Sequence, residues 1–377
     1  MAIRITFAGG GSGGHLYPLI SIADELKKQT PKGEECVISY FGPRHPLAEE
    51  FEAREIRQYR IASSKLRRYF DIGNLIDIPK FFWSILQAIV KLYFVMPDVV
   101  FSKGGPGALA VVLAARWYRI PVIVHESDAV PGLTNRISAK FARTILTAFD
   151  EASAAFAPAH AEMVGNPVRA LFLGSYGVNR SMKGELQFDP QKPLALVLGG
   201  SQGSQRINTF ILENAELILP EVQLYMQTGG ANFEQARLLS QSAVRMLGAA
   251  YAGQFRIAPY FTGAQMRDAL DAADLVISRA GSGAIFEIAA AGKPAILIPL
   301  SDAAGDHQRA NAYAYSKNGA AAVIEESNLT PNLVLSQIHT ILNNQETLAK
   351  MRAGAHSFSK PDAAERIARI IREAVKG

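Results

Sequence analysis

The chain has 377 residues, and its 39 lysines and arginines outnumber its 34 aspartates and glutamates, giving a formal net charge of +5. This length predicts two or three domains, since one core rarely grows beyond about 250–300 residues. A hydrophobic fraction of 49% excludes a largely disordered chain. The single cysteine, Cys36, excludes an intramolecular disulfide and a cysteine-rich zinc site. The first residues lack the apolar region and cleavage site of a signal peptide, which predicts a cytoplasmic protein.

Short apolar runs alternate along the chain with segments of helical periodicity. The predicted strands cover residues 3–7, 36–41, 98–101, 122–124 and 144–147, and then 194–198, 223–226, 275–277, 295–299 and 321–324. Continuous apolar strands between helices are typical of parallel sheets covered on both faces. The predicted class is therefore α/β, with ligands at the carboxyl ends of the strands.

The most apolar long segment, residues 81–96, allows two interpretations. Gln87 and Lys91 interrupt it, and a spanning helix needs roughly 20 mainly apolar residues, so a transmembrane helix is rejected. One interpretation is a helix packed on a sheet with a solvated basic edge. The other is a surface that lies on anionic lipid, because basic residues from Lys65 to Lys80 precede Phe81, Phe82 and Trp83.

A first glycine loop, residues 9–14, follows the first strand and ends at His15. It fits the dinucleotide fingerprint G-x-G-x-x-G, but the second strand ends without the acid that binds a ribose diol. No Lys-Ser or Lys-Thr follows, so it is no Walker loop. A third interpretation is a turn that brings a ligand close to the backbone at a helix N-terminus. His15 is then either a base or anion contact, or a helix-capping residue without chemistry.

A second glycine loop, residues 199–203, follows the strand at 194–198. It matches G-x-S-x-G, the nucleophile elbow of α/β-hydrolases, with Ser201 as the nucleophile. That motif belongs in a single large sheet, whereas here it opens the second of two. The polar residues after Ser201 instead favour phosphate oxygens at a helix start.

Two further strand ends carry polar groups. After the strand at 275–277, a glycine turn leads into a helix with Ser282, Gly283 and Ala284 at its start. Glu287, one turn inside that helix, is placed to accept both hydrogen bonds of a ribose diol, or else faces solvent. Residues 306–311 combine Asp, His, Gln and Asn, which are side chains that hold sugar hydroxyls. Together these loops favour a nucleotide-sugar site over a dinucleotide site.

The two glycine loops lie half a chain apart, which predicts two similar domains in tandem. We expect the first domain to span residues 1–166 and the second 167–359, with the joint at residues 165–169 and a polar, irregular segment at 176–193. The last helix, in residues 360–377, is amphipathic, with Ala364, Ile367, Ile370, Ile371 and Ala374 on one face.

With these motifs in place, the chain resembles the MurG-type glycosyltransferases of bacterial peptidoglycan synthesis along nearly its whole length. Six motifs occur in that family's order, at residues 9–15, 125–135, 165–169, 199–203, 287–292 and 306–308. The resemblance implies a GT-B fold, with two Rossmann-like domains whose parallel sheets face each other across a cleft and a last helix that returns to the first domain. It also implies transfer of N-acetylglucosamine from UDP-GlcNAc to undecaprenyl-pyrophosphoryl-MurNAc-pentapeptide (lipid I), giving lipid II with inversion.

The resemblance also assigns residues. The second domain would hold the donor: Glu287 would bind the ribose, and the backbone near Thr262 would bind uracil. His307 and Gln308 would bind the sugar. The glycine loop and the helix start would bind the phosphates, and Arg169 would also contact the donor. The phosphate-side residues are Ser201, Gln202, Gly203, Ser282, Gly283 and Ala284. In the first domain Ser12, Gly13, Gly14 and His15 would face the acceptor pyrophosphate and the reaction centre. Glu126 and Asp128 lie in the same matched motif and complete the catalytic candidates.

Two departures from the family concern the acceptor side. The family usually has asparagine where this chain has Asp128, and an aromatic residue where it has Pro106. The predicted base is His15 or Asp128, with no metal site and no cofactor. The lipid acceptor favours a peripheral enzyme at the cytoplasmic face of the plasma membrane, which binds the anionic membrane surface through residues 65–96. No nucleic-acid partner is expected. The alternatives are a related transferase with another lipid or natural-product acceptor, an NAD(P)-dependent enzyme, and a noncatalytic sugar-nucleotide binder.

Overall fold

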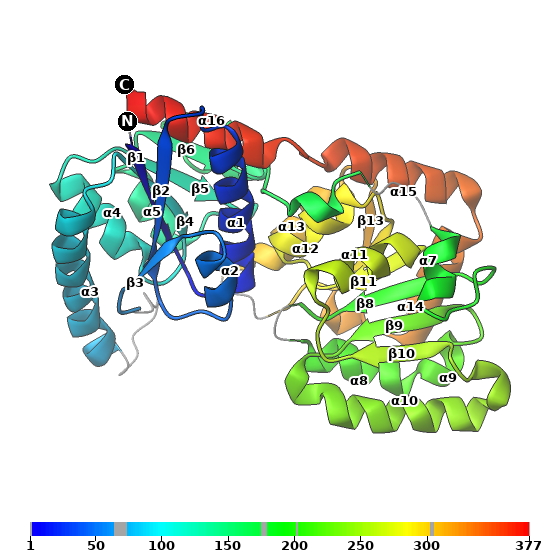
Figure 1. Ribbon diagram of the computed structural model, residues 1–377. Helices are drawn as coiled ribbons and strands as arrows, with labels where there is room; N and C mark the ends of the chain where they lie inside the picture. Colours follow the sequence, from blue (N-terminus) through cyan, green and yellow to red (C-terminus); the bar gives the residue numbers. More distant parts are fainter. Residues whose placement is uncertain (1, 64–73, 175–178, 201–202, 302–304, 377) are drawn as a thin grey trace. The chain divides into compact units, whose positions relative to one another are not determined.

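The protein forms two α/β units. The computed structural model describes residues 2–63, 74–174, 179–200, 203–301 and 305–376. The first unit comprises Met1–Arg169 and Lys360–Gly377, and the second comprises Ala170–Ser359. Each unit has its own parallel sheet with helices around it (Figure 1). The predicted α/β class with two Rossmann-like sheets is confirmed.

The sheet of the first unit has the strand order β3-β2-β1-β4-β5-β6-β7 among the described residues, with every pair parallel. Its strands are β1 (Ala2–Gly9), β2 (Glu35–Gly42), β3 (Arg57–Arg60), β4 (Val99–Gly104), β5 (Val122–Glu126), β6 (Thr144–Thr147) and β7 (Ala161–Met163). Its helices are α1 (Gly13–Lys28), α2 (Ala48–Glu52), α3 (Asn74–Val95), α4 (Ala108–Trp117), α5 (Leu133–Ala139), α6 (Asp150–Ala154) and α16 (Ala363–Lys376).

The second sheet has the order β10-β9-β8-β11-β12-β13 over the residues described, again all parallel. Its strands are β8 (Leu194–Leu198), β9 (Gln223–Gln227), β10 (Phe255–Ala258), β11 (Leu275–Ser278), β12 (Ala295–Leu297) and β13 (Ala321–Val323). Its helices are α7 (Arg180–Glu185), α8 (Gln205–Glu213), α9 (Ala215–Ile218), α10 (Phe233–Leu247), α11 (Gly263–Ala272), α12 (Ser282–Ala290), α13 (His307–Ser316), α14 (Pro331–Leu342) and α15 (Gln345–Phe358).

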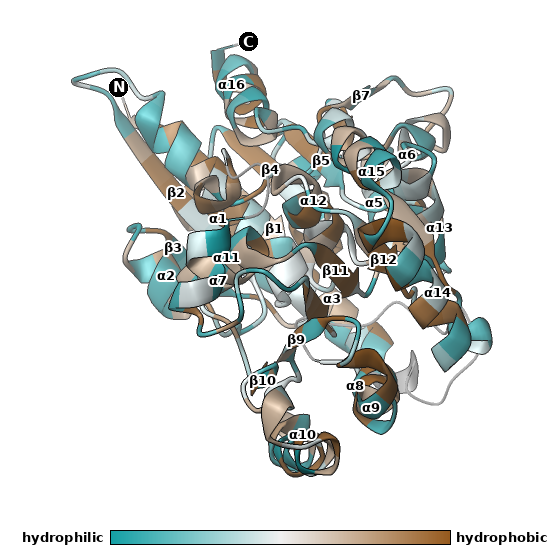
Figure 2. Ribbon diagram, turned by 90° about the vertical axis from the view of Figure 1, so that its right-hand side faces the viewer, coloured by the Kyte–Doolittle hydropathy of each residue, from teal (hydrophilic) through white to brown (hydrophobic). Residues whose placement is uncertain are grey.

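The predicted apolar runs form strands that are buried on both sides, because helices cover both faces of each sheet. In β1, Ile5 and Phe7 point to the core under α1 and α16, whereas Ala8 points to the core under α3 and α4. In the second unit β8 and β11 are buried along their whole length. Figure 2 shows β11 as strongly hydrophobic. Of the segment 176–193, expected to be irregular, residues 176–178 lie outside the described residues, and α7 forms in the remainder with Asn179 as its N-cap.

The last helix, α16, packs on α1 of the first unit, and the two lie side by side in Figure 1. Ile367 and Ile371 are fully buried in the same core as Leu19. Polar contacts surround this apolar contact: Arg366 pairs with Glu162 at 2.9 Å, and the Gln29 side chain donates to the Glu365 carbonyl oxygen at 3.1 Å. The apolar face predicted for this helix is therefore the face that it buries.

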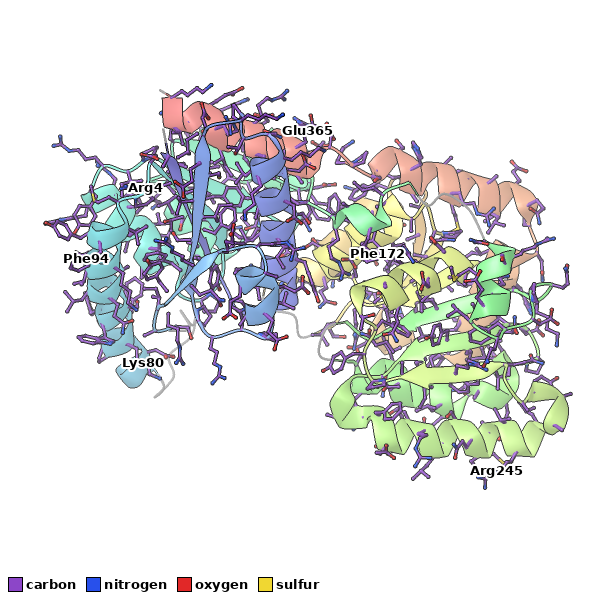
Figure 3. All side chains as sticks on the ribbon, in the orientation of Figure 1. Arg4, Lys80, Phe94, Phe172, Arg245 and Glu365 are labelled. Atoms are coloured by element: carbon purple, nitrogen blue, oxygen red, sulfur yellow. The ribbon has the colours of Figure 1, made fainter. Side chains whose placement is uncertain are left out.

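Helix α3 carries two different faces. Ser84, Ala88 and Leu92 are fully buried, and the last two pack with α4 in one core. The opposite side leaves large apolar residues exposed, among them Phe94, which is 79% exposed and is labelled in Figure 3. By length and composition alone, Asp77–Val95 could also cross a membrane, and most of that stretch is not buried in the domain. The buried side nevertheless makes α3 part of the first unit's core.

Candidate active site

The first glycine loop lies at the carboxyl edge of the first sheet, between β1 and α1. The Ser12 carbonyl oxygen accepts hydrogen bonds from the backbone N–H groups of His15 and Leu16, at 3.0 and 3.1 Å, which forms the first turn of α1. The Tyr40 hydroxyl donates to the carbonyl oxygens of Gly9 and Gly10 at 3.1 and 3.2 Å. Ser12 and Gly14 are exposed at the helix start. Such a helix N-terminus presents unpaired N–H groups to an anion.

His15 lies in the first turn of α1, directly after this loop, as a half-buried residue. Its Nδ1 is buried and has no hydrogen-bond partner among the described residues. Burial, and next the charge of Lys103, lower the pKa of His15 below 6.5, while Asp128 acts in the opposite direction. A neutral imidazole with one unpartnered nitrogen is suited to accept a proton.

Glu126, at the end of β5, is a buried carboxylate that holds the loop after it. Its Oε1 accepts from the backbone N–H of Asp128 at 3.0 Å. Its Oε2 accepts from the Gly132 N–H at 3.0 Å and from Asn135 Nδ2 at 2.9 Å. Burial, and next Asp128, raise the pKa of Glu126 despite these hydrogen bonds. Both oxygens of Glu126 are thus engaged in fixing the segment that carries Asp128.

Arg169, the last residue of the first unit before the crossover, stacks on Tyr17 of α1. Its guanidinium carbon lies 4.3 Å from the centre of the Tyr17 ring. The same ring would be 3.3 Å from a Cβ atom placed on Gly13. The stack therefore holds a cation beside the glycine-rich start of α1.

The second glycine loop lies at the carboxyl end of β8. Its Ser201 and Gln202 lie outside the described residues. Gly203 has a φ of +77°, and a Cβ atom there would lie 2.4 Å from the Thr228 carbonyl oxygen, so only glycine fits. Ser204 then caps α8 by accepting from the Ile207 N–H at 3.3 Å. The loop ends at a helix N-terminus, as the sequence indicated.

Thr262 is the N-cap of α11 and forms a capping box with Gln265. Thr262 Oγ1 accepts from the Gln265 N–H at 3.3 Å, and the Thr262 N–H donates to Gln265 Oε1 at 2.9 Å. The N–H of the preceding Phe261 donates to Gln227 Oε1 at 2.9 Å. The backbone at Thr262 is thus fixed by its own helix cap and by β9.

The helix starts after β11 and β12 carry the remaining candidates. Gly281 is the N-cap of α12, so Ser282, Gly283 and Ala284 form its first turn, and Glu287 follows as a half-buried residue. His307 is the first residue of α13, and Gln308 Oε1 accepts from the Leu300 N–H at 3.1 Å. These residues all lie at the carboxyl edge of the second sheet.

Sequence reasoning missed Arg279, a buried cation at the end of β11. Its Nε donates to Ser204 Oγ and its Nη1 to the Ile298 carbonyl oxygen, both at 3.1 Å, while its Nη2 pairs with Glu326. Glu326 in turn accepts from the backbone N–H and the hydroxyl of Ser301 at 3.2 and 2.8 Å. One guanidinium therefore connects the loops that follow β8 and β12.

Replacing Arg279 with Met is expected to destabilise the second domain by about 3 kcal/mol, because Glu326 would keep a partly buried charge without its cation. Burial alone would raise the pKa of Glu326, but hydrogen bonds from Arg279 and Ser301 hold it below 4.5. This stabilisation is present above the ordinary carboxyl pKa and is lost as the pH falls through the lowered value. Calorimetry at pH 7 measures the loss of unfolding free energy as a lower midpoint of thermal unfolding. Arg267→Met, which removes an exposed ion pair with Asp268, is the control and should leave the transition unmoved; an equal shift in both variants would contradict the prediction.

The architecture is shared with solved structures. The crystal structure of MurG from Acinetobacter baumannii superposes with a TM-score of 0.74 at 26% identity, covering 98% of this chain and 99% of that one. UDP-GlcNAc 2-epimerase from Neisseria meningitidis shares the fold alone, with a TM-score of 0.68 at 15% identity, over 98% of this chain and all of that one. Two Rossmann-like domains with glycine loops at their strand ends define the GT-B class.

The particular family follows from sequence. The N-terminal domain of glycosyltransferase family 28 matches residues 5–147, and the C-terminal domain of that family matches residues 194–367. The UDP-N-acetylglucosamine–N-acetylmuramyl-(pentapeptide) pyrophosphoryl-undecaprenol N-acetylglucosamine transferase of Syntrophotalea carbinolica is 35% identical over 98% of both chains. The same-named protein of Clostridium kluyveri is 36% identical over 93% of this chain and 95% of its own. The chain belongs to glycosyltransferase family 28, in its MurG-type branch.

Proposed function

We propose that this enzyme transfers N-acetylglucosamine from UDP-GlcNAc to the muramic acid 4-hydroxyl of undecaprenyl-pyrophosphoryl-MurNAc-pentapeptide, with inversion, and so forms lipid II. The observation that carries the proposal is the 35% identity over 98% of both chains with a transferase named for this reaction. Most of the motifs that carry this likeness follow the carboxyl ends of strands, where α/β proteins bind ligands.

The second domain is proposed to bind the donor. The N-termini of α8 and α12, with Gly203, Ser282, Gly283 and Ala284, would receive the diphosphate together with Ser201, Gln202 and the cation of Arg169. Glu287 would accept from the ribose hydroxyls, and the backbone near Thr262 would meet uracil. His307 and Gln308 would contact the sugar. Helix N-termini favour the negative charge that develops on departing UDP.

The first domain is proposed to bind the acceptor and supply the base. Ser12, Gly13 and Gly14 would meet the acceptor pyrophosphate at the start of α1. His15 Nδ1 would take the proton of the 4-hydroxyl as its oxygen bonds to the sugar C1 and the C1–O bond to UDP breaks. Asp128 is the alternative base. The contacts of Glu126 favour a role in holding Asp128 rather than in proton transfer.

Purified protein incubated with UDP-GlcNAc and a soluble lipid I analogue tests the proposal. We expect UDP and a disaccharide product in equal amounts. Turnover with another acceptor only would show that lipid I is not the acceptor. UDP binding without turnover would indicate a noncatalytic sugar-nucleotide binder. Binding of a nicotinamide cofactor would indicate the NAD(P)-dependent alternative.

We further propose that the exposed side of α3 binds an anionic membrane surface, which places the enzyme peripherally at the cytoplasmic face of the plasma membrane. The exposed apolar residues of this side are Ile78, Phe82, Trp83, Leu86, Val90, Tyr93 and Phe94. Their helical spacing gives one continuous apolar face, and the exposed Lys80 borders it near the N-terminal end of the helix (Figure 3). The basic residues at 65–68, which contributed to this expectation, lie outside the described residues.

Changing Phe82 and Trp83 to Ser is expected to weaken binding to vesicles of anionic phospholipid at least tenfold, because two side chains that are 65% and 56% exposed would no longer enter the lipid interface. Vesicle co-sedimentation measures the loss, and activity on a soluble acceptor should persist. The matched control is Leu238→Ser with Met246→Ser on α10, which are 61% and 65% exposed. Equal loss in both pairs, or none with Phe82 and Trp83 changed, would argue against this surface.

A further inference from the structure

A buried ion pair between Arg279 and Glu326 lies at the carboxyl end of β11. Arg279 is 7% exposed, and the side chain of Glu326 is 15% exposed. The Nη2 of Arg279 pairs with Glu326, while its Nε donates to Ser204 Oγ and its Nη1 to the Ile298 carbonyl oxygen, both at 3.1 Å. All three nitrogens of the guanidinium are therefore engaged inside the second domain.

Glu326, held by Arg279, binds the segment after β12 at Ser301. Its Oε2 accepts from the Ser301 backbone N–H at 3.2 Å and from the Ser301 hydroxyl at 2.8 Å. At the other end of this short segment, the Ile298 carbonyl oxygen accepts from Arg279 itself. One ion pair thus fixes residues 298–301 at both ends.

The same segment fixes the side-chain amide of Gln308. The backbone N–H of Leu300 donates to Gln308 Oε1 at 3.1 Å. A backbone N–H can only donate, so the amide oxygen must point to Leu300, and this assigns the orientation of the amide. Gln308 is half-buried in the first turn of α13, and its Nε2 makes no hydrogen bond with the part of the chain that the structure describes. The group that Gln308 offers to a ligand is therefore a donor.

We propose that Glu326 is a positioning residue for Gln308: by fixing Ser301, and with it Leu300, it orients the Gln308 amide so that Nε2 donates to an oxygen atom of the sugar. The proposal rests on the proposed function, in which Gln308 contacts the N-acetylglucosamine part of the donor. It adds to that function a residue that touches no substrate and yet determines how the sugar is held.

Arg279 connects this arrangement to the phosphate side of the site. Ser204 Oγ accepts from Arg279 Nε and also from the Ile207 N–H, at 3.3 Å, as the N-cap of α8. One guanidinium therefore supports both the helix start proposed for phosphate and the carboxylate that fixes the segment beside Gln308. A change at Glu326 that leaves Arg279 on Ser204 should affect the sugar and spare the binding of UDP.

Glu326→Gln tests this separation. The variant keeps the size of the side chain but places an amide nitrogen where one carboxylate oxygen was, so a donor replaces an acceptor toward Arg279 or Ser301. We expect the Kd for UDP-GlcNAc to rise about tenfold, the effect of losing roughly one hydrogen bond to the sugar, and the Kd for UDP to change less than about twofold. Calorimetric titration with each nucleotide measures both values without an acceptor.

Gln308→Ala should show the same selective loss, because it removes the contact that Glu326 orients. The double variant should bind UDP-GlcNAc no more weakly than Gln308→Ala alone, since residues that act through one another are not additive. A purely structural role of Glu326 would not produce this coupling. It would weaken the binding of UDP and of UDP-GlcNAc together.

Two further variants guard against an effect of folding. Ser301→Ala keeps the ion pair, removes the hydrogen bond from the exposed Ser301 hydroxyl, and should raise the Kd for UDP-GlcNAc about threefold. The matched control is Asp274→Asn, because Asp274 is 17% exposed and pairs with the buried Lys183 at 2.6 Å. Asp274 also accepts from the Leu194 N–H at the start of β8, so it lies at the opposite edge of the sheet. It should lower thermal stability and leave both Kd values unchanged.

Selective and non-additive losses in Glu326→Gln and Gln308→Ala would support the proposal. Equal losses of UDP and UDP-GlcNAc affinity in Glu326→Gln, or additive losses in the double variant, would overturn it. Should Glu326→Gln fail to fold, Ser301→Ala decides, and an unchanged Kd for UDP-GlcNAc there would count against the positioning. Absence of turnover with the lipid I analogue in the unaltered enzyme would instead contradict the proposed function, while the titrations still judge the role of Glu326.

Discussion

His15→Ala is expected to lower kcat by about 10²–10⁴-fold, the usual contribution of a general base. Nδ1 of this residue is buried without a partner among the described residues, and its lowered pKa keeps the ring neutral at pH 7. Because the proposed role concerns proton transfer, the affinity for UDP-GlcNAc should change little. Steady-state kinetics with a soluble acceptor, and calorimetric titration with UDP-GlcNAc, measure the two effects separately.

His160→Ala is the matched control, since His160 is an exposed histidine of the same domain. It should retain full kcat. An unchanged kcat in His15→Ala would remove His15 from the reaction and leave Asp128 as the candidate base; Asp128→Asn would then be the variant that loses activity.

Glu287→Ala is expected to raise the KM for UDP-GlcNAc by about 100-fold with little change in kcat. A carboxylate that accepts two hydrogen bonds from a ribose diol contributes roughly 1.5–3 kcal/mol per bond, and at least one of them is lost outright. Glu287 is half-buried on α12, close behind the first turn proposed for phosphate. Initial rates over a range of donor concentrations measure the change.

A donor with a 2′-deoxyribose sharpens this test. The native enzyme should bind it weakly, whereas Glu287→Ala should hardly distinguish it from UDP-GlcNAc, because the lost partner is the same in both cases. Glu234→Ala, on the exposed side of α10, should behave as the unaltered enzyme. Additive losses from the variant and the deoxy donor would refute the ribose contact.

The central strands were predictable because a strand that is buried on both faces of its sheet has a continuous run of apolar residues in the sequence. Every predicted run lies within or overlaps an observed strand, from β1 to β13. Three strands of the part of the chain that the structure describes were missed: β3, β7 and β10. Each lies at a sheet edge, where one side meets water and polar residues are tolerated, as in the sequence Arg57-Gln58-Tyr59-Arg60 of β3. Each of the three forms by parallel pairing with the strand that precedes it in the chain, and such pairing leaves no apolar pattern in the edge strand itself.

The glycine loops were equally predictable, because a positive φ or a close backbone approach leaves no choice of residue, as at Gly203. The residues that support the site were harder to find. Arg279 did carry a signal, since an isolated charge between an apolar strand and a glycine turn is costly unless it is paired. Lys103 carried none: its partners His125 and Asn166 are 22 and 63 residues away, and only the fold brings them together.

The return of α16 to the first unit has a consequence for the order in which the protein is made. Residues 170–359 are one continuous stretch, so the second domain can complete its core as soon as it leaves the ribosome. The first domain, although synthesised earlier, lacks Ile367 and Ile371 against Leu19 until the final residues emerge. The first unit is therefore completed after the second, and until α16 is made, the apolar side of α1 that packs on it lacks this cover.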